Sequence, residues 1–241
     1  MPVNLDVALS AQLALIKRMD SIANNVANSS TVGFRADEIS FESLISQQTS
    51  QPTAFTTSGR THISRNAGAL ISTNNPLDVA VQGDAWLAFQ SPNGTAYTRD
   101  GRMQMLETGE LQTVNGHSIL DAGGAPLVLN PGSGPPQIAR DGMITQNNQQ
   151  VGAIGLFSLP ENAQLARFEN SGVVPNLPAE PILDFTANGV AQGFIEQSNV
   201  NPVKQMTDLI AVSRTFESLA SAISDTESTL QNAIRTLGES S

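Results

Sequence analysis

Hydrophobic residues recur at helical spacing at both ends of the chain. From about Val3 to Asn28, apolar side chains follow one another at alternating intervals of three and four residues. The same spacing runs through four heptads from Leu209 to Leu237. This is the spacing of the two core positions of a coiled-coil heptad. We therefore expect one long helix at each end of the chain, each carrying a narrow apolar seam.

The carboxy-terminal helix has predictable boundaries. Asn201 can cap its first turn, and Pro202 suits the first helical position, where the missing N–H costs nothing. Gly238 follows the last apolar residue and indicates the end of the helix. A helix from Pro202 to Leu237 would be on the order of 50 Å long. That length favours a coiled coil over a helix buried in a globular core.

The middle of the chain has a different pattern, in which short strand-like runs alternate with turn signals. Between Leu77 and Leu129, runs such as LDVAVQ and AWLAFQ are separated by turns such as SPNG, and Asn115-Gly116 is a hairpin signal. Nothing between Thr53 and Val200 has the pattern of a long helix. We expect an antiparallel β domain here, with further strands at 151–159, 164–168, 181–185 and 190–197.

These patterns predict an α+β fold, in which a discontinuous coiled coil of terminal helices carries an inserted antiparallel all-β domain. Residues 1–35 form the first helix and an elbow, and 36–75 form an extended polar linker, since they contain few large apolar residues. Residues 76–197 form the β domain. Residues 198–241 form the second helix, which pairs antiparallel with 1–35. The remaining apolar edges of the helices then face neighbouring copies of the chain.

The stretch IANNVANSSTVGFR, residues 22–35, ends the first helix with several amide side chains. Asparagine side chains bond to the local backbone and so terminate helices. Gly33 permits a positive φ, and Phe34 can then fold back onto an apolar surface. Three asparagines are more than a helix end needs, so we expect their amides to contact partner chains. The expected assembly interface comprises Leu15, Met19, Ile22, Asn24, Asn25, Val26, Asn28, Gly33, Phe34, Leu209, Phe216, Leu219, Ile223 and Leu230.

Composition excludes several classes of function. The formal net charge is −10 with only 12 lysines and arginines, which argues against nucleic-acid binding. The chain has no cysteine, so it has neither disulfides nor thiolate metal sites. No run of about 18 apolar residues occurs, so we expect no membrane insertion. The amino terminus lacks a basic region before its apolar residues, so we expect no cleavable signal peptide.

Residues suited to catalysis are few. His62 and His117 lie in turn-rich polar contexts without zinc-site spacing, and we expect them to be exposed loop residues. Two carboxylates suffice for glycan hydrolysis, but each acidic candidate lies beside a turn signal, where carboxylates are ordinarily solvated. These candidates are Asp100, Glu107, Glu110 and Asp121. We therefore expect no enzyme, no cofactor and no metal; a cell-wall glycan hydrolase and a module that binds one partner are the alternatives.

The stretch IANNVANSSTVGFR resembles the amino-terminal signature of the bacterial flagellar rod and hook proteins, an ANN-aliphatic-AN core followed by a Gly-Phe pair. GFIEQSNVNPVKQMTDLIAVSRTFES resembles the carboxy-terminal signature of the same family, where SNV precedes a helix containing an aromatic residue and Glu, here Phe216-Glu217. NPLDVAVQGDAWLAF and YTRDGRM resemble internal segments of the rod members. The four matches occur in the family's order and cover nearly the whole chain.

This resemblance implies a structural subunit of the basal-body rod, which crosses the periplasm and transmits torque. The subunits would stack helically around a channel, with the terminal helices inside and the β domain outside. Implied partners are copies of the chain, other rod proteins and the flagellar type III export apparatus. The opening sequence looks most like the proximal rod members. The distal rod members are the alternative, although they usually carry Tyr where this chain has Phe216.

Overall fold

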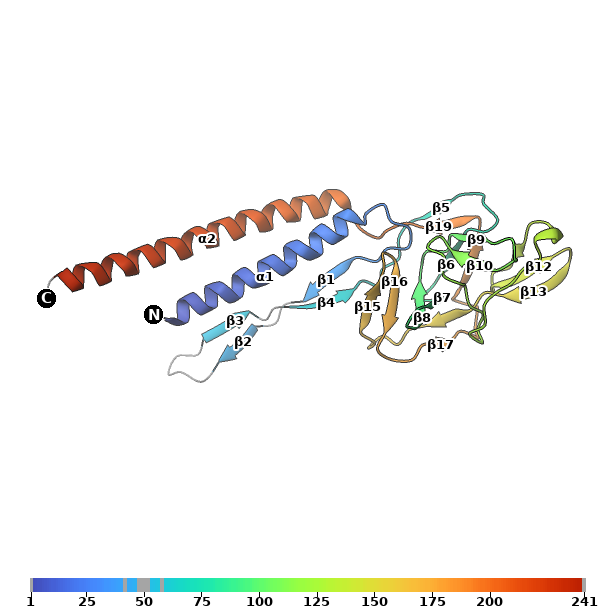
Figure 1. Ribbon diagram of the computed structural model, residues 1–241, viewed down its shortest axis with the longest axis horizontal. Helices are drawn as coiled ribbons and strands as arrows, with labels where there is room; N and C mark the ends of the chain where they lie inside the picture. Colours follow the sequence, from blue (N-terminus) through green and yellow to red (C-terminus); the bar gives the residue numbers. More distant parts are fainter. Residues whose placement is uncertain (1, 41–42, 47–52, 57–58, 240–241) are drawn as a thin grey trace. The chain divides into compact units, whose positions relative to one another are not determined.

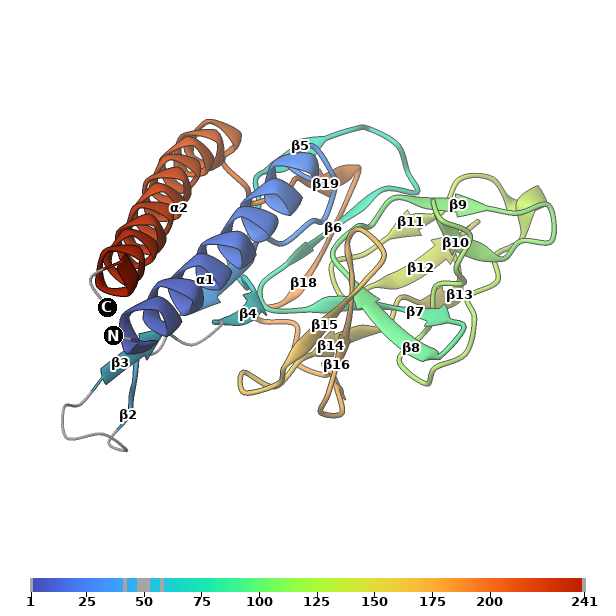
Figure 2. The same ribbon diagram turned by 60° about the vertical axis from the view of Figure 1, so that its left-hand side comes forward.

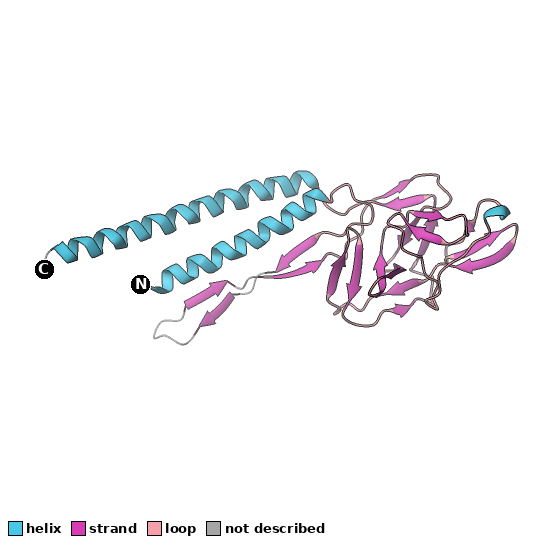
Figure 3. Ribbon diagram, viewed as in Figure 1, coloured by secondary structure: helices cyan, strands magenta, loops and turns pink. Residues whose placement is uncertain are grey.

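The computed structural model describes residues 2–40, 43–46, 53–56 and 59–239 (Figure 1). Two long helices and many antiparallel strands give an α+β fold with a β domain (Figure 3). In chain order the elements are α1 (Pro2–Ala27), β1 (Asp37–Ser40), β2 (Ser43–Ser46), β3 (Thr53–Thr56), β4 (Arg60–Ile63), β5 (Leu70–Ser72), β6 (Val79–Gln82), β7 (Trp86–Ser91), β8 (Gly94–Thr98), β9 (Met103–Met105), β10 (Leu111–Thr113), the 3-10 helix η1 (Pro131–Ser133), β11 (Gln137–Ile138), β12 (Met143–Gln146), β13 (Gln149–Ala153), β14 (Leu156–Ser158), β15 (Leu165–Phe168), β16 (Gly172–Pro175), β17 (Glu180–Pro181), β18 (Gly189–Gln192), β19 (Phe194–Glu196) and α2 (Pro202–Glu239).

The chain forms two compact units, each built from separate stretches of sequence. The helical unit comprises Met1–Ala27, Asp37–His62 and Asn201–Ser241. The β unit comprises Asn28–Ala36 and Ile63–Val200. The expected boundaries at 35, 75 and 197 differ from these, because the elbow after the first helix belongs to the β unit.

In the helical unit, α1 and α2 lie side by side and run in opposite directions (Figures 1 and 2). α1 also packs against β1 and β3, so it lies between α2 and these strands. The Oδ1 atom of Asn201 accepts a hydrogen bond from the Lys204 N–H at 3.1 Å, which confirms the predicted cap. α2 continues to Glu239, one residue beyond the predicted stop at Gly238. Helix ends fray, and their assignment varies by a residue or two.

The segment expected to be an extended polar linker, residues 36–75, contains five short strands, β1 to β5. β1 pairs with β4, and β2 pairs with β3 in antiparallel register. Residues 41–42, 47–52 and 57–58 of this segment lie outside the described residues. The described part is extended as expected, but strand pairing and α1 give it partners that its polar composition did not indicate.

The β unit is built around an antiparallel six-stranded sheet in the order β15-β16-β8-β7-β14-β17. β7 and β8 are joined by a tight turn, with Ser91 paired to Gly94, which confirms the hairpin expected at SPNG. The smaller sheets are β11-β12-β13 and the pairs β6-β18, β5-β19 and β9-β10. All pairings described are antiparallel, as the regular spacing of turns predicted.

The core of the β unit lies on both faces of β7. Trp86 and Ala88 point into one buried cluster, whereas Leu87 and Phe89 point into another. Successive side chains of a strand face opposite sides, so a strand buried on both sides has no polar alternation. This explains why AWLAFQ alternates poorly although it forms a strand.

Several expected strands have different extents. The run 151–159 is divided between β13 and β14, and the strand expected at 181–185 is confined to β17, Glu180–Pro181. β16, Gly172–Pro175, was not expected, yet it lies between β15 and β8 in the large sheet. A run of four residues bounded by glycine and proline carries too little periodicity to be distinguished from a loop.

Candidate assembly interface

α1 and α2 pack against each other, and the predicted seam residues whose side chains are described are buried or half-buried. Ile22 of α1 and Val212 of α2 are buried. The other seam residues are half-buried, namely Leu15, Met19, Val26, Leu209, Phe216, Leu219 and Ile223. Leu230 belongs to α2, but its side chain lies outside the described part of the structure. The seam therefore serves first to join the two ends of one chain.

Each helix carries a second apolar stripe, which remains exposed. In α1 the exposed stripe is Leu9, Leu13 and Ile16, and in α2 it is Val203, Met206 and Ile210. Leu13 lies nine residues before Ile22, which places it on the opposite side of a helix with 3.6 residues per turn. Leu13 and Ile210 are each 55% exposed. These two faces are apolar but uncovered in a single chain.

The asparagines near the end of α1 form hydrogen bonds within their own chain. Asn25 is buried; its Nδ2 donates to the Asp37 carbonyl at 2.9 Å, and its Oδ1 accepts from the Asp37 N–H at 2.8 Å. Asn24 Nδ2 donates to Asp37 Oδ2 at 2.6 Å, and Ser21 Oγ donates to the Asp37 carbonyl at 2.9 Å. The Asn25 side chain thus bonds both backbone groups of Asp37, as a neighbouring strand would, and joins β1 to α1.

Asn28 also bonds within the chain, because its Oδ1 accepts a hydrogen bond from Thr31 Oγ1 at 3.2 Å. We expected the three amides to contact partner chains. The structure gives each of them a hydrogen-bond partner within the same chain.

Gly33 and Phe34 form a buried elbow within the β unit. Gly33 has φ of +68°, and a Cβ there would lie 2.2 Å from the Asp100 nitrogen. The sequence indicated a positive φ at this position. Phe34 is fully buried and lies under the Arg167 guanidinium, 4.3 Å from ring centroid to Cζ. Phe34 folds back as expected, but onto its own β unit, so it offers no surface to a neighbour in this conformation.

Next to the elbow is a buried group of charges, Arg35, Arg99 and Glu196, which we call the charge clasp. The Arg35 guanidinium lies 2.7 Å from Glu196 Oε1, and Arg99 Nε lies 3.0 Å from Glu196 Oε2 as an ion pair without hydrogen-bond alignment. Both guanidinium groups lie over the Trp86 ring, whose centroid is 5.9 Å from Arg35 Cζ and 5.8 Å from Arg99 Cζ. Arg35 also donates to the carbonyls of Arg65, at 2.9 Å, and Asn66.

The charge clasp holds two positive charges and one negative charge out of water. Burial and the neighbouring Arg99 together lower the pKa of Arg35 to about 10, against the opposing effects of Glu196 and Asp84. Burial likewise lowers the pKa of Arg99, against the attraction of Glu196. Such a group stabilises a structure only when its hydrogen bonds are made, and it fixes one geometry strongly.

Asn199 of the SNV sequence closes the same region. Its Oδ1 accepts from the Ala36 N–H at 2.8 Å, and its Nδ2 donates to the Asn66 carbonyl at 2.8 Å. Sequence reasoning did not single out Arg35, Arg99, Glu196 or Asn199. No local signal marked them, because Asp100 follows Arg99 directly and the residues on either side of Glu196 are not buried.

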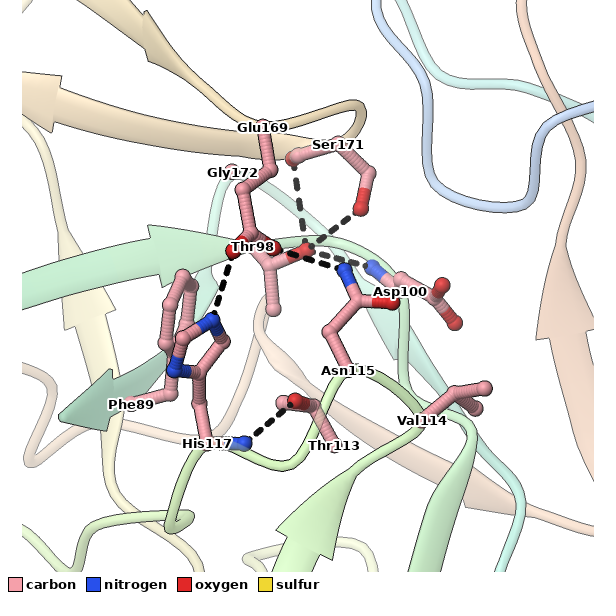
Figure 4. A pocket seen from close by; sticks show the side chains of 10 residues that line it. All are labelled: Phe89, Thr98, Asp100, Thr113, Val114, Asn115, His117, Glu169, Ser171 and Gly172. Carbon is pink, nitrogen blue, oxygen red and sulfur yellow. Dashed lines mark hydrogen bonds and ion pairs between the residues drawn. The ribbon is translucent and has the colours of Figure 1, made fainter. Parts of the chain in front are cut away.

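Among the described residues of the β unit, Phe89, His117 and Glu169 help to line a small cavity, which Figure 4 shows. Its volume is about 20 Å³, enough for roughly one water molecule. His117 bonds Glu169 Oε1 at 2.8 Å, and its ring lies tilted against Phe89 and edge-on to Phe168. The expectation of an exposed loop histidine is wrong for His117, because aromatic packing half-buries it. His62 is exposed, but it lies in β4.

Metal sites and membrane-spanning helices are two further features to consider. In the described ranges, three or more His, Cys, Asp or Glu side chains are nowhere arranged to hold a metal ion. No helix within those ranges has the length and apolar character needed to cross a membrane.

Three family models match the chain, in the order of its units. Residues 5–35 match the model described as flagella basal body rod protein. Residues 80–175 match the flagellar hook protein FlgE/F/G D1 domain, and 191–236 match the flagellar basal body rod FlgEFG protein C-terminal. The first and last matches contain the terminal helices and the elbow, and the middle match lies in the β unit.

The chain is also similar along its whole length to curated proteins. It is 50% identical to the flagellar basal-body rod protein FlgF of Mesorhizobium japonicum, over 99% of each chain. This chain therefore belongs to the family of flagellar basal-body rod proteins. It is 43% identical to FlgF of Rhizobium meliloti over 100% of each chain, and 27% identical to the rod protein FlgG of Bacillus subtilis over 90% of this chain and 92% of that one. The higher identities place it with FlgF-like rod proteins.

Proposed function

We propose that this chain is a structural subunit of the proximal part of the flagellar rod, which polymerises helically through its terminal helices and transmits torque across the periplasm. FlgF-named relatives at 50% and 43% identity over the full chain support the rod role. The distal rod position of FlgG is the alternative within the family. The subunit works without catalysis or a cofactor, and it is exported by the flagellar type III apparatus.

One observation carries the assembly mechanism: each terminal helix has two apolar faces, and only one of them is covered within the chain. In the polymer, the seam of α1 and α2 forms a coiled-coil pair, and the exposed stripes pack against neighbouring copies or related rod proteins. Burying one leucine or isoleucine side chain contributes about 1.5–3 kcal/mol before the ordering entropy is subtracted. The six exposed stripe residues are therefore enough to drive a strong contact when copies align.

The glycan hydrolase alternative has little support in the β unit. Three of the acidic candidates bond to nearby residues: Asp100 pairs with Arg102 at 2.6 Å, Glu110 Oε1 accepts a hydrogen bond from Ser118 Oγ, and Asp121 accepts hydrogen bonds from the Gly123 and Ala125 N–H groups. Catalysis by two carboxylates needs a space for the glycan between them. Purified protein incubated with peptidoglycan should release no soluble fragments.

Substitutions on the two faces of the helices test the proposal. Leu13→Asp places a charge in the exposed stripe, and Leu219→Asp places one in the seam. Both should abolish rod assembly and swarming in a strain that lacks the wild-type copy. Leu219→Asp should also separate α2 from α1 in the isolated protein, whereas Leu13→Asp should not, and both should leave the β unit folded. Helical content by circular dichroism separates the two effects.

A matched control is Ser218→Asp, since Ser218 is exposed on α2 outside the exposed stripe. It should assemble normally. Swarming by Leu13→Asp at the wild-type rate would contradict assembly through the exposed stripes. If the wild-type chain itself were missing from purified basal bodies, the rod role would be wrong.

A further inference from the structure

The ribbon formed by β5 and β19, residues 70–72 and 194–196, presents apolar side chains to solvent; we call it the apolar ribbon. Leu70 and Ile71 are each 43% exposed, and Phe194 is 39% exposed. Ile71 lies directly opposite Ile195 in antiparallel register. Each of these side chains is large enough to anchor a protein contact. Successive side chains of a strand face opposite sides, so Leu70 and Phe194 lie on one face of this two-stranded element and Ile71 lies on the other.

The outer edge of β5 carries backbone groups that face away from β19. Thr73 N donates to the Gly193 carbonyl and Gln197 N donates to the Ala69 carbonyl, both at 2.8 Å. Hydrogen-bonded pairs alternate in an antiparallel ladder, so the N–H and C=O of Leu70 and Ser72 point outward. Among the described strands, β19 alone pairs with β5. An apolar edge of this kind is a template for a further chain.

Charge indicates which chain can approach the apolar ribbon. The β unit has six arginines and twelve acidic residues, a formal charge of −6. The stretches 66–77 and 185–195, which contain most of the apolar ribbon, have no ionisable side chain. Glu196 is buried in the charge clasp. Two copies of an acidic unit repel each other except where uncharged surfaces meet, and interface cores are depleted of charge.

We propose that the apolar ribbon is a contact between copies of this chain, in which the outer edge of β5 lies against the β unit of a neighbouring copy. This inference rests on the proposed function, because it requires copies of the chain to be adjacent in a polymer. It adds a contact outside the terminal helices. Neighbouring copies are then joined at two separate places, one in the helical unit and one in the β unit.

Photo-crosslinking in assembled basal bodies tests the contact directly. The chain with p-benzoylphenylalanine at position 71 is expressed in place of the wild type, irradiated, and isolated with the basal body. We expect an adduct between two copies of the chain, identified by mass spectrometry. The control carries the probe at Leu183, an apolar residue that is 85% exposed in the β unit outside the apolar ribbon, and should give no such adduct.

An adduct only with a different rod protein, or none from basal bodies that contain the probe chain, would overturn the inference and leave the rod role intact. Absence of even the wild-type chain from basal bodies would instead contradict the proposed function. If the probe at 71 prevents incorporation, the probe at Phe194 replaces it. Loss of incorporation at both positions, with normal incorporation at Leu183, would support the contact.

A pair of substitutions gives a second measurement. Ile71→Asp should lower the yield of assembled rods by about tenfold or more, because it places a charge in an apolar contact. Leu183→Asp makes the same change outside the apolar ribbon and should leave the yield unchanged. The thermal unfolding temperature of the purified full-length protein should be similar for both variants. Equal yields from the two variants would show that the apolar ribbon is not an assembly contact.

Discussion

Gly33 lies where a side chain would need both an unfavourable backbone conformation and space that is already filled. Its φ is +68°, and a Cβ would meet the Asp100 backbone at 2.2 Å. Gly33→Ala should therefore destabilise the β unit by more than the roughly 1–3 kcal/mol typical of backbone strain alone. Urea unfolding followed by Trp86 fluorescence measures this change, since Trp86 is buried beside the charge clasp.

Gly124 supplies the control, because it has φ of +82° and nothing within 4 Å of an added Cβ. Gly124→Ala should cost about 1 kcal/mol, the strain without the collision. A Gly33→Ala variant as stable as Gly124→Ala would show that the elbow can move away from Asp100.

Glu196 neutralises part of a buried positive charge. Glu196→Gln keeps the size of the side chain but leaves Arg35 and Arg99 without a counter-ion. Removing one partner of a buried ion pair costs about 3–5 kcal/mol, because the remaining charge stays desolvated. The free energy of unfolding of the purified variant, from urea titration, should fall by that amount.

Glu38→Gln is the matched control, since Glu38 pairs with His62 at 3.2 Å and both side chains are more than half exposed. An exposed ion pair contributes about 0–1 kcal/mol. If both glutamine variants were equally stable, water would have to reach the charge clasp in the native protein.

At the scale of elements, the two helices depend on each other far more than the strands do. α2 packs chiefly against α1, whereas β7 is buried on both faces. A lone pair of helices with exposed apolar stripes opens readily. In a dilute monomer, amides of α1 and α2 should therefore exchange with deuterium faster than those of β7 and β8. Mass spectrometry of peptic fragments provides the measurement.

If neighbours cover the stripes in assembled rods, as we propose, the expected difference should disappear there. Strong protection of both helices in a dilute monomer would mean that the pair is stable by itself. The exposed stripes would then have no part in ordering the helices.

The strength of periodicity decided which elements could be predicted from sequence. Long heptad patterns gave both helices within two residues at each end, and turn signals gave most strands of the large sheet. β16 and the strands of 36–75 were missed or read as linker because three- and four-residue strands carry almost no period. Their partners, such as α1 for β3, lie far away in the sequence.

At the scale of the whole molecule, the seam was predictable but its partner was not. The spacing of Leu219 and Ile223 predicts that they are on one face; both are half-buried, and α1 of the same chain packs against α2. The sequence also drew attention to the asparagines and Phe34. Their partners, Asp37 and Arg167, could not be read from the sequence, because each contact joins positions that no local pattern connects.

The discontinuity of the helical unit has a consequence in time. Whether a chain emerges from the ribosome or from a channel amino terminus first, α1 appears at the start and α2 only after some 170 intervening residues. The last residue of the β unit is Val200, so this unit can fold before α2 is available to pack against α1. A subunit that joins the rod through its terminal helices, as we propose, can do so only after α2 has emerged.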